Sequence, residues 1–165
     1  MTTTVKETFN GGTPTALTIT LNSLTNTSAR QSTAMDFTSS LPIDVQIDGV
    51  FKTASGSLGA NPALNLWFSP SIDGTNFGGT NGTNVIGGGD AAFTMPANRA
   101  NLVFLGAVPI NTAAAIERFS FKSLLAALGS IPQKGVLIVE NVTGLTLDSS
   151  AGGSIQFLPI NFTNG

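Results

Sequence analysis

The carboxylates are the first residues in this chain that could carry out chemistry. Asp44 and Asp48 would lie on one face of an extended segment, about 13 Å apart at a rise of about 3.3 Å per residue. Paired acids that hydrolyse glycosidic bonds stand about 5 to 10 Å apart, which is closer than this spacing allows. We therefore interpret the two acids as part of a solvated strand face, because exposed acids need no special function.

Two short segments could ligate a cation through oxygen atoms. Residues 73–76, Asp-Gly-Thr-Asn, gather several oxygens as Ca²⁺ requires, but the further spaced acids of an EF-hand loop are missing. An Asx turn explains the same residues without an ion. Residues 87–90, Gly-Gly-Gly-Asp, partly match the repeat of Ca²⁺-binding β-rolls, but the match occurs once. We expect no metal site and no cofactor.

The chain lacks the side chains on which most catalytic sites depend. It contains no His, Cys or Tyr, and 10% of its residues are charged. Proton transfer near neutral pH, thiol chemistry and soft-metal ligation mostly use those three side chains. The serines have no histidine to act as a general base, and a lysine base would have to be buried. We therefore expect no catalytic residues and interpret the protein as a non-enzyme.

Charge and hydropathy argue against two classes of partner. The net charge is −2 and the Lys and Arg residues are scattered, which disfavours nucleic acid. The first residues lack the charged-then-apolar pattern of a signal peptide, so we expect synthesis in a cytoplasm. The longest nearly unbroken apolar run, 102–110, is far shorter than the about 20 residues that span a bilayer. A surface with so few charges must be covered by partners or hydrated by hydroxyls and amides, as in an assembly subunit.

Aromatic residues offer one further binding chemistry. Trp67 with Phe68 or Phe77 could form a platform on which a sugar ring stacks. Because the chain has one Trp and no Tyr, ordinary packing at a sheet edge or a subunit boundary explains these residues better. Asn-X-Ser/Thr triplets also occur, beginning at Asn26, Asn81, Asn141 and Asn161. We interpret them as a by-product of the Thr-rich composition.

Alternation of apolar and polar residues predicts the elements that position these groups. Residues 1–14 are polar, contain Gly and Pro and show no sustained period, so they predict an N-terminal arm without a regular element. From Ala16 the pattern is strict, with Leu17, Ile19 and Leu21 on one side and threonines on the other. This alternation predicts a half-buried strand.

The clearest predicted strand covers residues 43–53, in which apolar and polar residues alternate. Gly49 falls at an apolar position of this strand, which suggests a bulge or a close approach of another group to its backbone. In the following strand, over residues 64–69, Trp67 falls opposite the aliphatic positions. We therefore expect the Trp67 side chain to be partly exposed.

The rest of the chain consists of short apolar segments separated by turn residues. Residues 78–90 are rich in Gly, Asn and Thr and predict a flexible surface loop outside the core. Ser123 as N-cap and Gly129 as C-terminal stop predict one short helix over residues 123–129. Further strands are predicted at residues 91–95, 101–107, 116–121, 135–141, 145–148 and 154–160.

Together these elements predict an all-β fold. About nine short strands, one small helix and no βαβ rhythm are typical of an antiparallel β-sandwich or jelly roll. No repeat of about 20 to 50 residues is present, which argues against solenoids and propellers. We expect one β-sandwich domain over residues 15–165, preceded by the arm of residues 1–14.

Parts of the chain resemble small structural proteins of tailed bacteriophages. The segments are residues 50–56 (VFKTASG), 64–77 (LNLWFSPSIDGTNF), the V-E-N-x-T-G hairpin of 139–144 and the Gly-rich reversal of 150–153. The resemblance covers about residues 43–160 and consists of turn chemistry and strand alternation. It implies a β-sandwich decoration (cement) protein or another accessory virion subunit, often trimeric. It implies no catalytic residue.

This resemblance leads to a hypothesis for function. The protein would be a capsid decoration subunit on the virion surface that binds the major capsid protein and bridges neighbouring capsomers. It would assemble with itself as a homotrimer, so that weak contacts are multiplied, and it would contact neither nucleic acid nor membrane. The first alternative is a carbohydrate-binding β-sandwich module, such as a phage adsorption or lectin-like protein. The second is a hydrolase, which would need two carboxyls within reach of one bond.

Overall fold

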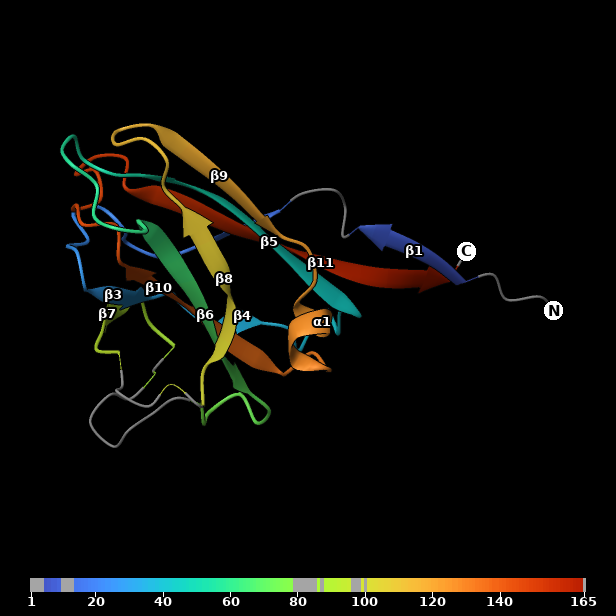
Figure 1. Ribbon diagram of the computed structural model, residues 1–165. Coiled ribbons are helices and arrows are strands. Elements are labelled where there is room, and N and C mark those ends of the chain that lie inside the picture. The colour runs from blue at the N-terminus through green and yellow to red at the C-terminus, as the bar shows by residue number, and fades with distance from the viewer. Residues whose placement is uncertain are drawn as a thin grey trace.

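Two antiparallel β-sheets face each other in the computed structural model, with the main hydrophobic core between them (Figure 1). The structure describes residues 5–9, 14–78, 86, 88–95, 99 and 101–164. The first sheet contains, in spatial order, β1 (Val5–Phe9), β11 (Gly153–Asn164), β5 (Asp44–Lys52) and β9 (Ile116–Phe121), and β2 (Thr15–Leu17) also pairs with β11. The second sheet contains β7 (Ala91–Phe93), β3 (Ala29–Gln31), β10 (Lys134–Asn141), β6 (Ala63–Ser71) and β8 (Val103–Pro109), and β4 (Met35–Asp36) also pairs with β10. The predicted all-β antiparallel sandwich is confirmed, whereas the jelly roll and the bounds of the domain stay predictions.

The main core follows from the alternation in β5 and β6. Val45, Ile47 and Phe51 of β5 are fully buried, and the residues between them are half-buried. Leu64 and Phe68 of β6 are equally buried in the facing sheet. Full burial of a side chain of this kind contributes about 1.5–3 kcal/mol, so these facing rows hold the two sheets together.

Gly49 makes room for an aromatic ring inside the sandwich. The ring of Phe119 stacks on that of Phe51, with centroids 5.0 Å apart and planes 6° apart. A β carbon at residue 49 would lie 2.5 Å from Cε1 of Phe119, which is closer than side chains approach one another. The close approach that the sequence suggests at Gly49 is therefore confirmed, and the approaching group is the Phe119 ring on β9.

A smaller hydrophobic cluster covers the outer face of the second sheet. Val136 and Ile138 of β10 are fully buried in it, so this strand is buried on both faces. Ile86 belongs to the same cluster and is 2% exposed. The prediction that residues 78–90 lie outside the core is therefore wrong for Ile86. The average composition of this segment is polar, and it gave no sign that a single residue within it is buried. Residues 79–85 and 87 of that segment lie outside the described part.

A five-residue helix, α1 (Leu124–Leu128), confirms the helix predicted from its two ends. The Oγ of Ser123 accepts a hydrogen bond from the backbone N–H of Ala126 at 3.0 Å, which caps the first turn. Gly129 adopts a left-handed backbone, φ 76°, and donates to the carbonyl of Leu125. Among the described residues, no helix is long and apolar enough to cross a membrane.

The structure contains strands that alternation does not predict. Val5–Phe9 forms β1, so the prediction that residues 1–14 hold no regular element is wrong there, while residues 1–4 and 10–13 lie outside the described residues. The partner of β1 is β11, at the other end of the chain, and a local pattern cannot reveal such a pair. β3 and β4 have three and two residues, too few for alternation to be detected.

Two predicted strands differ from the structure. The strand expected from Ala16 ends at Leu17, although Leu21 is buried as the alternation predicts. Residues 145–148 form no strand, and Leu147 makes one isolated bridge with Thr53 instead. The remaining strands agree with their predicted ranges to within a few residues.

β11 continues beyond the edge of the sandwich. β5 pairs with β11 as far as Ile160, which lies opposite Asp44. From Ile160 to Asn164, β11 pairs with β1 in a register that sets Phe9 opposite Ile160. We call β1 together with residues 160–164 the terminal ribbon. In Figure 1 the terminal ribbon extends away from the packed sheets to one side of the molecule.

Candidate functional site

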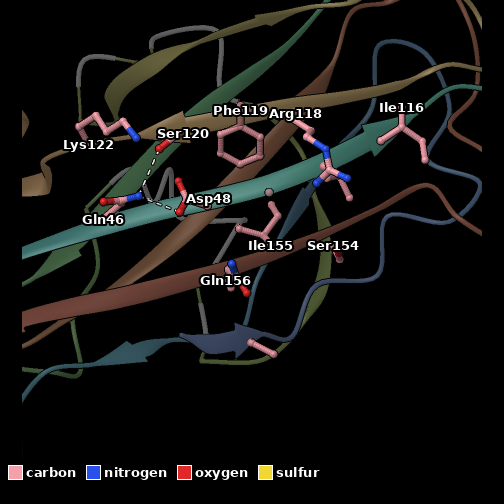
Figure 2. A pocket seen from close by; sticks show the side chains of 13 residues that line it. Gln46, Asp48, Ile116, Arg118, Phe119, Ser120, Lys122, Ser154, Ile155 and Gln156 are labelled. Carbon is pink, nitrogen blue, oxygen red and sulfur yellow. Dashed lines mark hydrogen bonds between the residues drawn. The ribbon is translucent and has the colours of Figure 1, made fainter. Parts of the chain in front are cut away.

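A hollow of about 740 Å³ lies on the outer face of the first sheet, over β9, β5 and β11 (Figure 2). The register of the strands builds its centre, because Asp48 lies opposite Ser120 on β9 and opposite Gln156 on β11. Alternation directs these polar side chains outward, since their neighbours along each strand belong to the core. We call this site the outer hollow.

Two cations line the outer hollow without an acidic partner. Arg118 and Lys122, both exposed residues of the β9 segment, form no ion pair within the described part of the chain. The other four cations with described side chains each lie within 4 Å of a carboxylate oxygen, in the pairs Arg30–Asp90, Lys52–Asp148, Arg99–Glu140 and Lys134–Asp36. Among the cations with described side chains, the two without an ion pair therefore both lie at the outer hollow.

Asp48 contributes an acceptor that its own chain does not satisfy. Its Oδ2 accepts a hydrogen bond from Nε2 of Gln46 at 2.8 Å, and the same amide lies 3.3 Å from Oγ of Ser120. Its Oδ1 is buried and has no hydrogen-bond partner in the described structure. A buried acceptor without a partner is uncommon and lowers the stability of the fold by about 1–3 kcal/mol. A ligand that donates a hydrogen bond to this oxygen would remove that cost.

The structure does not bring Asp44 and Asp48 together as an acid pair. Oδ1 of Asp44 accepts hydrogen bonds from the backbone N–H of Val45 and from that of Leu125 in α1, at 2.7 and 2.9 Å. Both acids are half-buried and hydrogen-bonded, so the prediction of a simply solvated strand face is wrong. Asp44 anchors the helix, whereas Asp48 belongs to the outer hollow.

The spacing of three polar residues in the sequence indicates one wall of the outer hollow, although the overall composition does not. Arg118, Ser120 and Lys122 are spaced two residues apart, which places them on one face of a strand. Counting all cations as scattered misses this local grouping. The opposing residues Gln46 and Gln156 could not be found, because the register of three strands distant in sequence brings them there.

The outer face of the second sheet carries a different polar cluster around Glu140, which is 6% exposed. Its Oε1 accepts from Nη2 of Arg99 at 2.6 Å. Its Oε2 accepts from Nδ2 of Asn65 and from Nε1 of Trp67, each at 3.1 Å. Both oxygens of this carboxylate therefore have donors from the chain itself, and we interpret the cluster as structural.

The aromatic platform considered for sugar stacking does not form. Trp67 is half-buried on the outer face, as predicted, but Phe68 is fully buried on the opposite side of β6. The guanidinium of Arg99 lies 5.3 Å from the centroid of the Trp67 ring, and Phe104 packs against that ring at 4.8 Å. Phe77 is half-buried against the smaller hydrophobic cluster. These aromatic residues pack the sheet rather than a ligand.

Asp73 forms the Asx turn that the sequence predicts. Its Oδ1 accepts from the backbone N–H groups of Thr75 and Asn76 at 2.9 and 2.7 Å, and its Oδ2 accepts from Nδ2 of Asn76. These bonds, led by the Asn76 backbone N–H, hold the pKa of Asp73 well below its usual value. Its oxygens are therefore occupied, and the described residues contain no cluster of three or more potential metal ligands among His, Cys, Asp and Glu.

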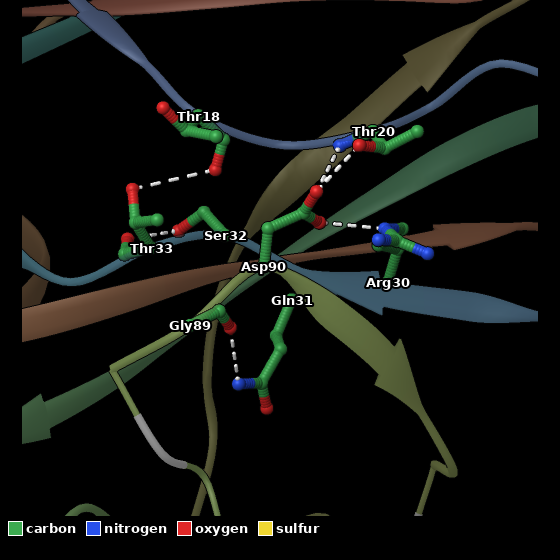
Figure 3. Close-up of polar contacts among 8 residues, drawn as sticks. All are labelled: Thr18, Thr20, Arg30, Gln31, Ser32, Thr33, Gly89 and Asp90. Carbon is green, nitrogen blue, oxygen red and sulfur yellow. Dashed lines mark hydrogen bonds and ion pairs between the residues drawn. The ribbon is translucent and has the colours of Figure 1, made fainter.

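Asp90 ties the loop before β7 to the sandwich (Figure 3). Its Oδ1 accepts from Nε of Arg30 at 2.6 Å, and its Oδ2 accepts from the backbone N–H and hydroxyl of Thr20. Burial alone would raise the pKa of Asp90, but the bonds from Arg30 and Thr20 outweigh it and lower the pKa. Gln31 adds a bond to the carbonyl of Gly89 at 2.8 Å. The partial match of residues 87–90 to a Ca²⁺-binding repeat thus serves as an anchor, with Gly87 outside the described residues.

Two of the four glycosylation-type asparagines shape a loop. Asn141 is fully buried, and its Nδ2 donates to the carbonyls of Leu24 and Leu145 at 2.8 Å. Oδ1 of Asn26 accepts from the backbone N–H of Gly144 at 2.9 Å. Asn161 lies in β11, and Asn81 lies outside the described residues. The interpretation of these triplets as incidental stays a prediction.

Carboxylate-anchored turns lead to a prediction about pH. The hydroxyl and the backbone N–H of Thr38, with Lys134, lower the pKa of Asp36 to about 2, and those of Ser150, with Lys52, lower the pKa of Asp148. A pKa lower in the folded than in the unfolded state gives stability that is complete above the unfolded value of about 3.9 and is lost as pH falls through the folded value. We expect a constant free energy of unfolding from pH 7 to 5, because the chain has no His, and a fall between about pH 4 and 2.

Urea unfolding at each pH measures this profile. Asp36→Asn, which keeps a side-chain acceptor for Thr38 but cannot titrate, should flatten part of the acid limb. A loss of stability centred near pH 6 would contradict the assignment, because no described carboxylate that anchors a turn titrates there.

Comparisons with known proteins identify no relative. No protein-family model matches the chain, and no curated protein matches it. The arrangement of its own residues therefore carries the functional argument.

Proposed function

We propose that this protein is a non-enzymatic structural subunit of a virion that docks on the capsid lattice and bridges neighbouring capsid subunits. The observation that carries the proposal is the terminal ribbon, which leaves the sandwich at the Ile160–Asp44 pair and beyond it pairs with no other strand of the described chain. The sequence resemblance to phage accessory proteins supports the same conclusion.

The terminal ribbon has the geometry of a docking element. A two-stranded ribbon is at best marginally stable in water, so a partner is needed to make it persist. β1 is the outermost strand of its sheet and presents unpaired backbone groups along its far edge within the described residues. Its sequence, VKETF, contains no proline to block a further strand. A neighbouring subunit can therefore extend the sheet by adding a strand to this edge.

Exposed apolar residues flank the base of the terminal ribbon. Leu41 is 79% exposed and precedes β5, whose first residue, Asp44, pairs with Ile160 where the ribbon begins. Leu125 of α1 is 39% exposed, and its backbone N–H bonds to Asp44. Leu41 also has a left-handed backbone, φ 41°, which costs a non-glycine residue about 1–2 kcal/mol. A leucine held exposed at such a position suits a contact with another subunit.

The proposal includes self-association as a trimer on the lattice. Each contact that we describe is small, and a trimer multiplies three such contacts through effective concentration. Sedimentation of the purified protein measures its mass, and a monomer at all concentrations contradicts this part of the proposal alone.

Leu41→Gly provides the sharpest test of docking. Glycine adopts the left-handed backbone freely, so we expect the variant to be as stable as the parent protein or about 1 kcal/mol more stable. We also expect it to bind capsids lacking this protein at least about tenfold more weakly, because a buried leucine contributes about 1.5–3 kcal/mol. Co-sedimentation with those capsids measures binding, and heat release of their contents measures reinforcement.

Two further variants complete this experiment. Deletion of residues 1–9 removes β1 and should abolish docking while the sandwich still unfolds cooperatively. Ile72→Gly removes an equally exposed leucine-sized residue (83% exposed) in the loop after β6 and serves as the matched control. If the parent protein neither binds these capsids nor raises their heat resistance, the proposed function is wrong.

A further inference from the structure

We propose that the outer hollow binds an acidic oligosaccharide, with Arg118 and Lys122 contacting its carboxylates and Asp48 accepting hydrogen bonds from its hydroxyls. This inference goes beyond capsid docking, because it assigns a ligand to a set of residues that the terminal ribbon and its flanking leucines do not include. It rests on one buried acceptor without a donor and on exposed polar side chains at the same site that have no partner within the described chain.

The positive charges at the outer hollow favour an acidic ligand. Arg118 and Lys122 are without an acidic partner in the described chain, although the other four cations with described side chains each have one. They are four residues apart, Arg118 within β9 and Lys122 directly after its end, which places their backbones about 13 Å apart at about 3.3 Å per residue. This separation suits an extended ligand that carries more than one carboxylate better than it suits a single small anion. Arginine and lysine bind carboxylates through charge-assisted hydrogen bonds.

The polar side chains that line the outer hollow favour a ligand rich in hydroxyl groups. Oδ1 of Asp48 lacks a donor, and the side chains of Ser154 and Gln156 form no hydrogen bond within the described structure. Figure 2 shows Gln156 and Asp48 on neighbouring strands of the same face. Sugar hydroxyls both donate and accept, so one ligand class satisfies a carboxylate, an amide and a hydroxyl side by side. Because Oδ1 is buried, the Asp48 side chain must rotate before this oxygen can accept a hydrogen bond from a ligand.

The elongated shape of the site favours a linear ligand. A second hollow of about 340 Å³ shares Val50, Ile116 and Ser154 with the outer hollow, so the two form a continuous groove along the sheet. Ile116 is 61% exposed and is the one strongly exposed large apolar residue lining this groove in the described chain. The other large apolar residues that line it, among them Val50, Phe51 and Phe119, are half-buried or buried, whereas protein interfaces are usually centred on exposed aromatic and apolar side chains. A linear, polar chain fits it better than a protein surface does.

Isothermal titration of the full chain with defined oligosaccharides tests the proposal. The probes are tetragalacturonate and a hyaluronan hexasaccharide, with maltotetraose as the neutral comparison, in low salt. We expect the acidic probes to bind at least about tenfold more tightly than maltotetraose, since a charge-assisted hydrogen bond is worth about 1.5–3 kcal/mol. Binding of the acidic probes should weaken in 0.5 M salt, because the cations are exposed and screened.

Point variants locate the site. Arg118→Gln and Lys122→Gln should each weaken binding of the acidic probes about five- to tenfold without changing the melting temperature, because both residues are exposed. Asp48→Ala, which removes both carboxylate oxygens, should weaken binding of acidic and neutral probes alike, since it removes an acceptor for sugar hydroxyls. Lys134→Gln removes the same charge from the other sheet and serves as the matched control.

Several results would overturn the inference. They are the absence of binding by either acidic probe at millimolar concentration, equal affinity for maltotetraose, or affinities that Arg118→Gln and Lys122→Gln leave unchanged. Oligoglutamate of matched charge is the remaining probe, and binding as tight as that of tetragalacturonate would show a general anion surface and contradict a saccharide site. Capsid binding is measured separately with Leu41→Gly, so either proposal can fail while the other holds.

Discussion

Gly135→Ala is expected to destabilise the protein by about 3 kcal/mol, which for a chain of this length lowers the melting temperature by about 6–12 °C. A β carbon at residue 135 would lie 2.6 and 2.7 Å from two ring carbons of Phe68 and closer still to its Cζ. Phe68 is fully buried in the main core and has no free space into which it can move. Thermal and urea unfolding measure the loss.

Gly89→Ala is the matched control for this substitution. A β carbon at residue 89 meets no atom within 4 Å, and we expect the free energy of unfolding to change by no more than about 0.5 kcal/mol. A pair of equal effects would mean that β6 and β10 do not pack as described. If only Gly135→Ala destabilises the protein, the contact between residue 135 of β10 and the Phe68 ring of β6 is too tightly packed to accept a methyl group.

Glu140→Ala is expected to cost about 3 kcal/mol of stability. The substitution leaves the Trp67 indole N–H and the Asn65 amide without their acceptor and removes the partner of Arg99. Breaking a buried ion pair typically costs about 3–5 kcal/mol, and we expect the lower end because the Arg99 side chain is 40% exposed and can be rehydrated. Trp67 is the one tryptophan of the chain, so its fluorescence reports the cluster directly.

Fluorescence distinguishes a local effect of this substitution from general loosening. We expect the emission of folded Glu140→Ala to shift to longer wavelength, because water reaches the indole. Lys134→Ala breaks an exposed pair with Asp36 and should cost at most about 1 kcal/mol, with no change in emission. If Glu140→Ala proved as mild as Lys134→Ala, the carboxylate would not be the centre of the cluster.

Elements with local patterns could be predicted from the sequence. The strand expected over residues 43–53 and the helix bounded by Ser123 and Gly129 are present, because each pattern is complete within about ten residues. The Asx turn at Asp73 follows from the same kind of local hydrogen bonding. Burial of Leu21 was also predictable, although the strand that should have carried it ends earlier.

Features that depend on distant pairing could not be predicted. Glu140 meets Asn65 because β10 and β6 pair in one register, which no local pattern encodes. Ile86 is buried in the cluster that contains Val136 and Ile138 of β10, and its polar neighbours in the sequence conceal this. The outer hollow is an intermediate case, since the spacing of Arg118 and Lys122 is visible in the sequence while the opposite wall is not.

The position of β11 in the chain affects how the protein folds during its synthesis. β11 is the common partner of β1, β2 and β5, and it follows all of them in chain order. Within the described chain β1 and β2 have no other strand partner, and β5 can pair only with β9, until residues 153–164 emerge. Non-local pairing of this kind is slow and leaves the nascent chain prone to aggregation. The first sheet therefore assembles late in translation, when its central strand becomes available.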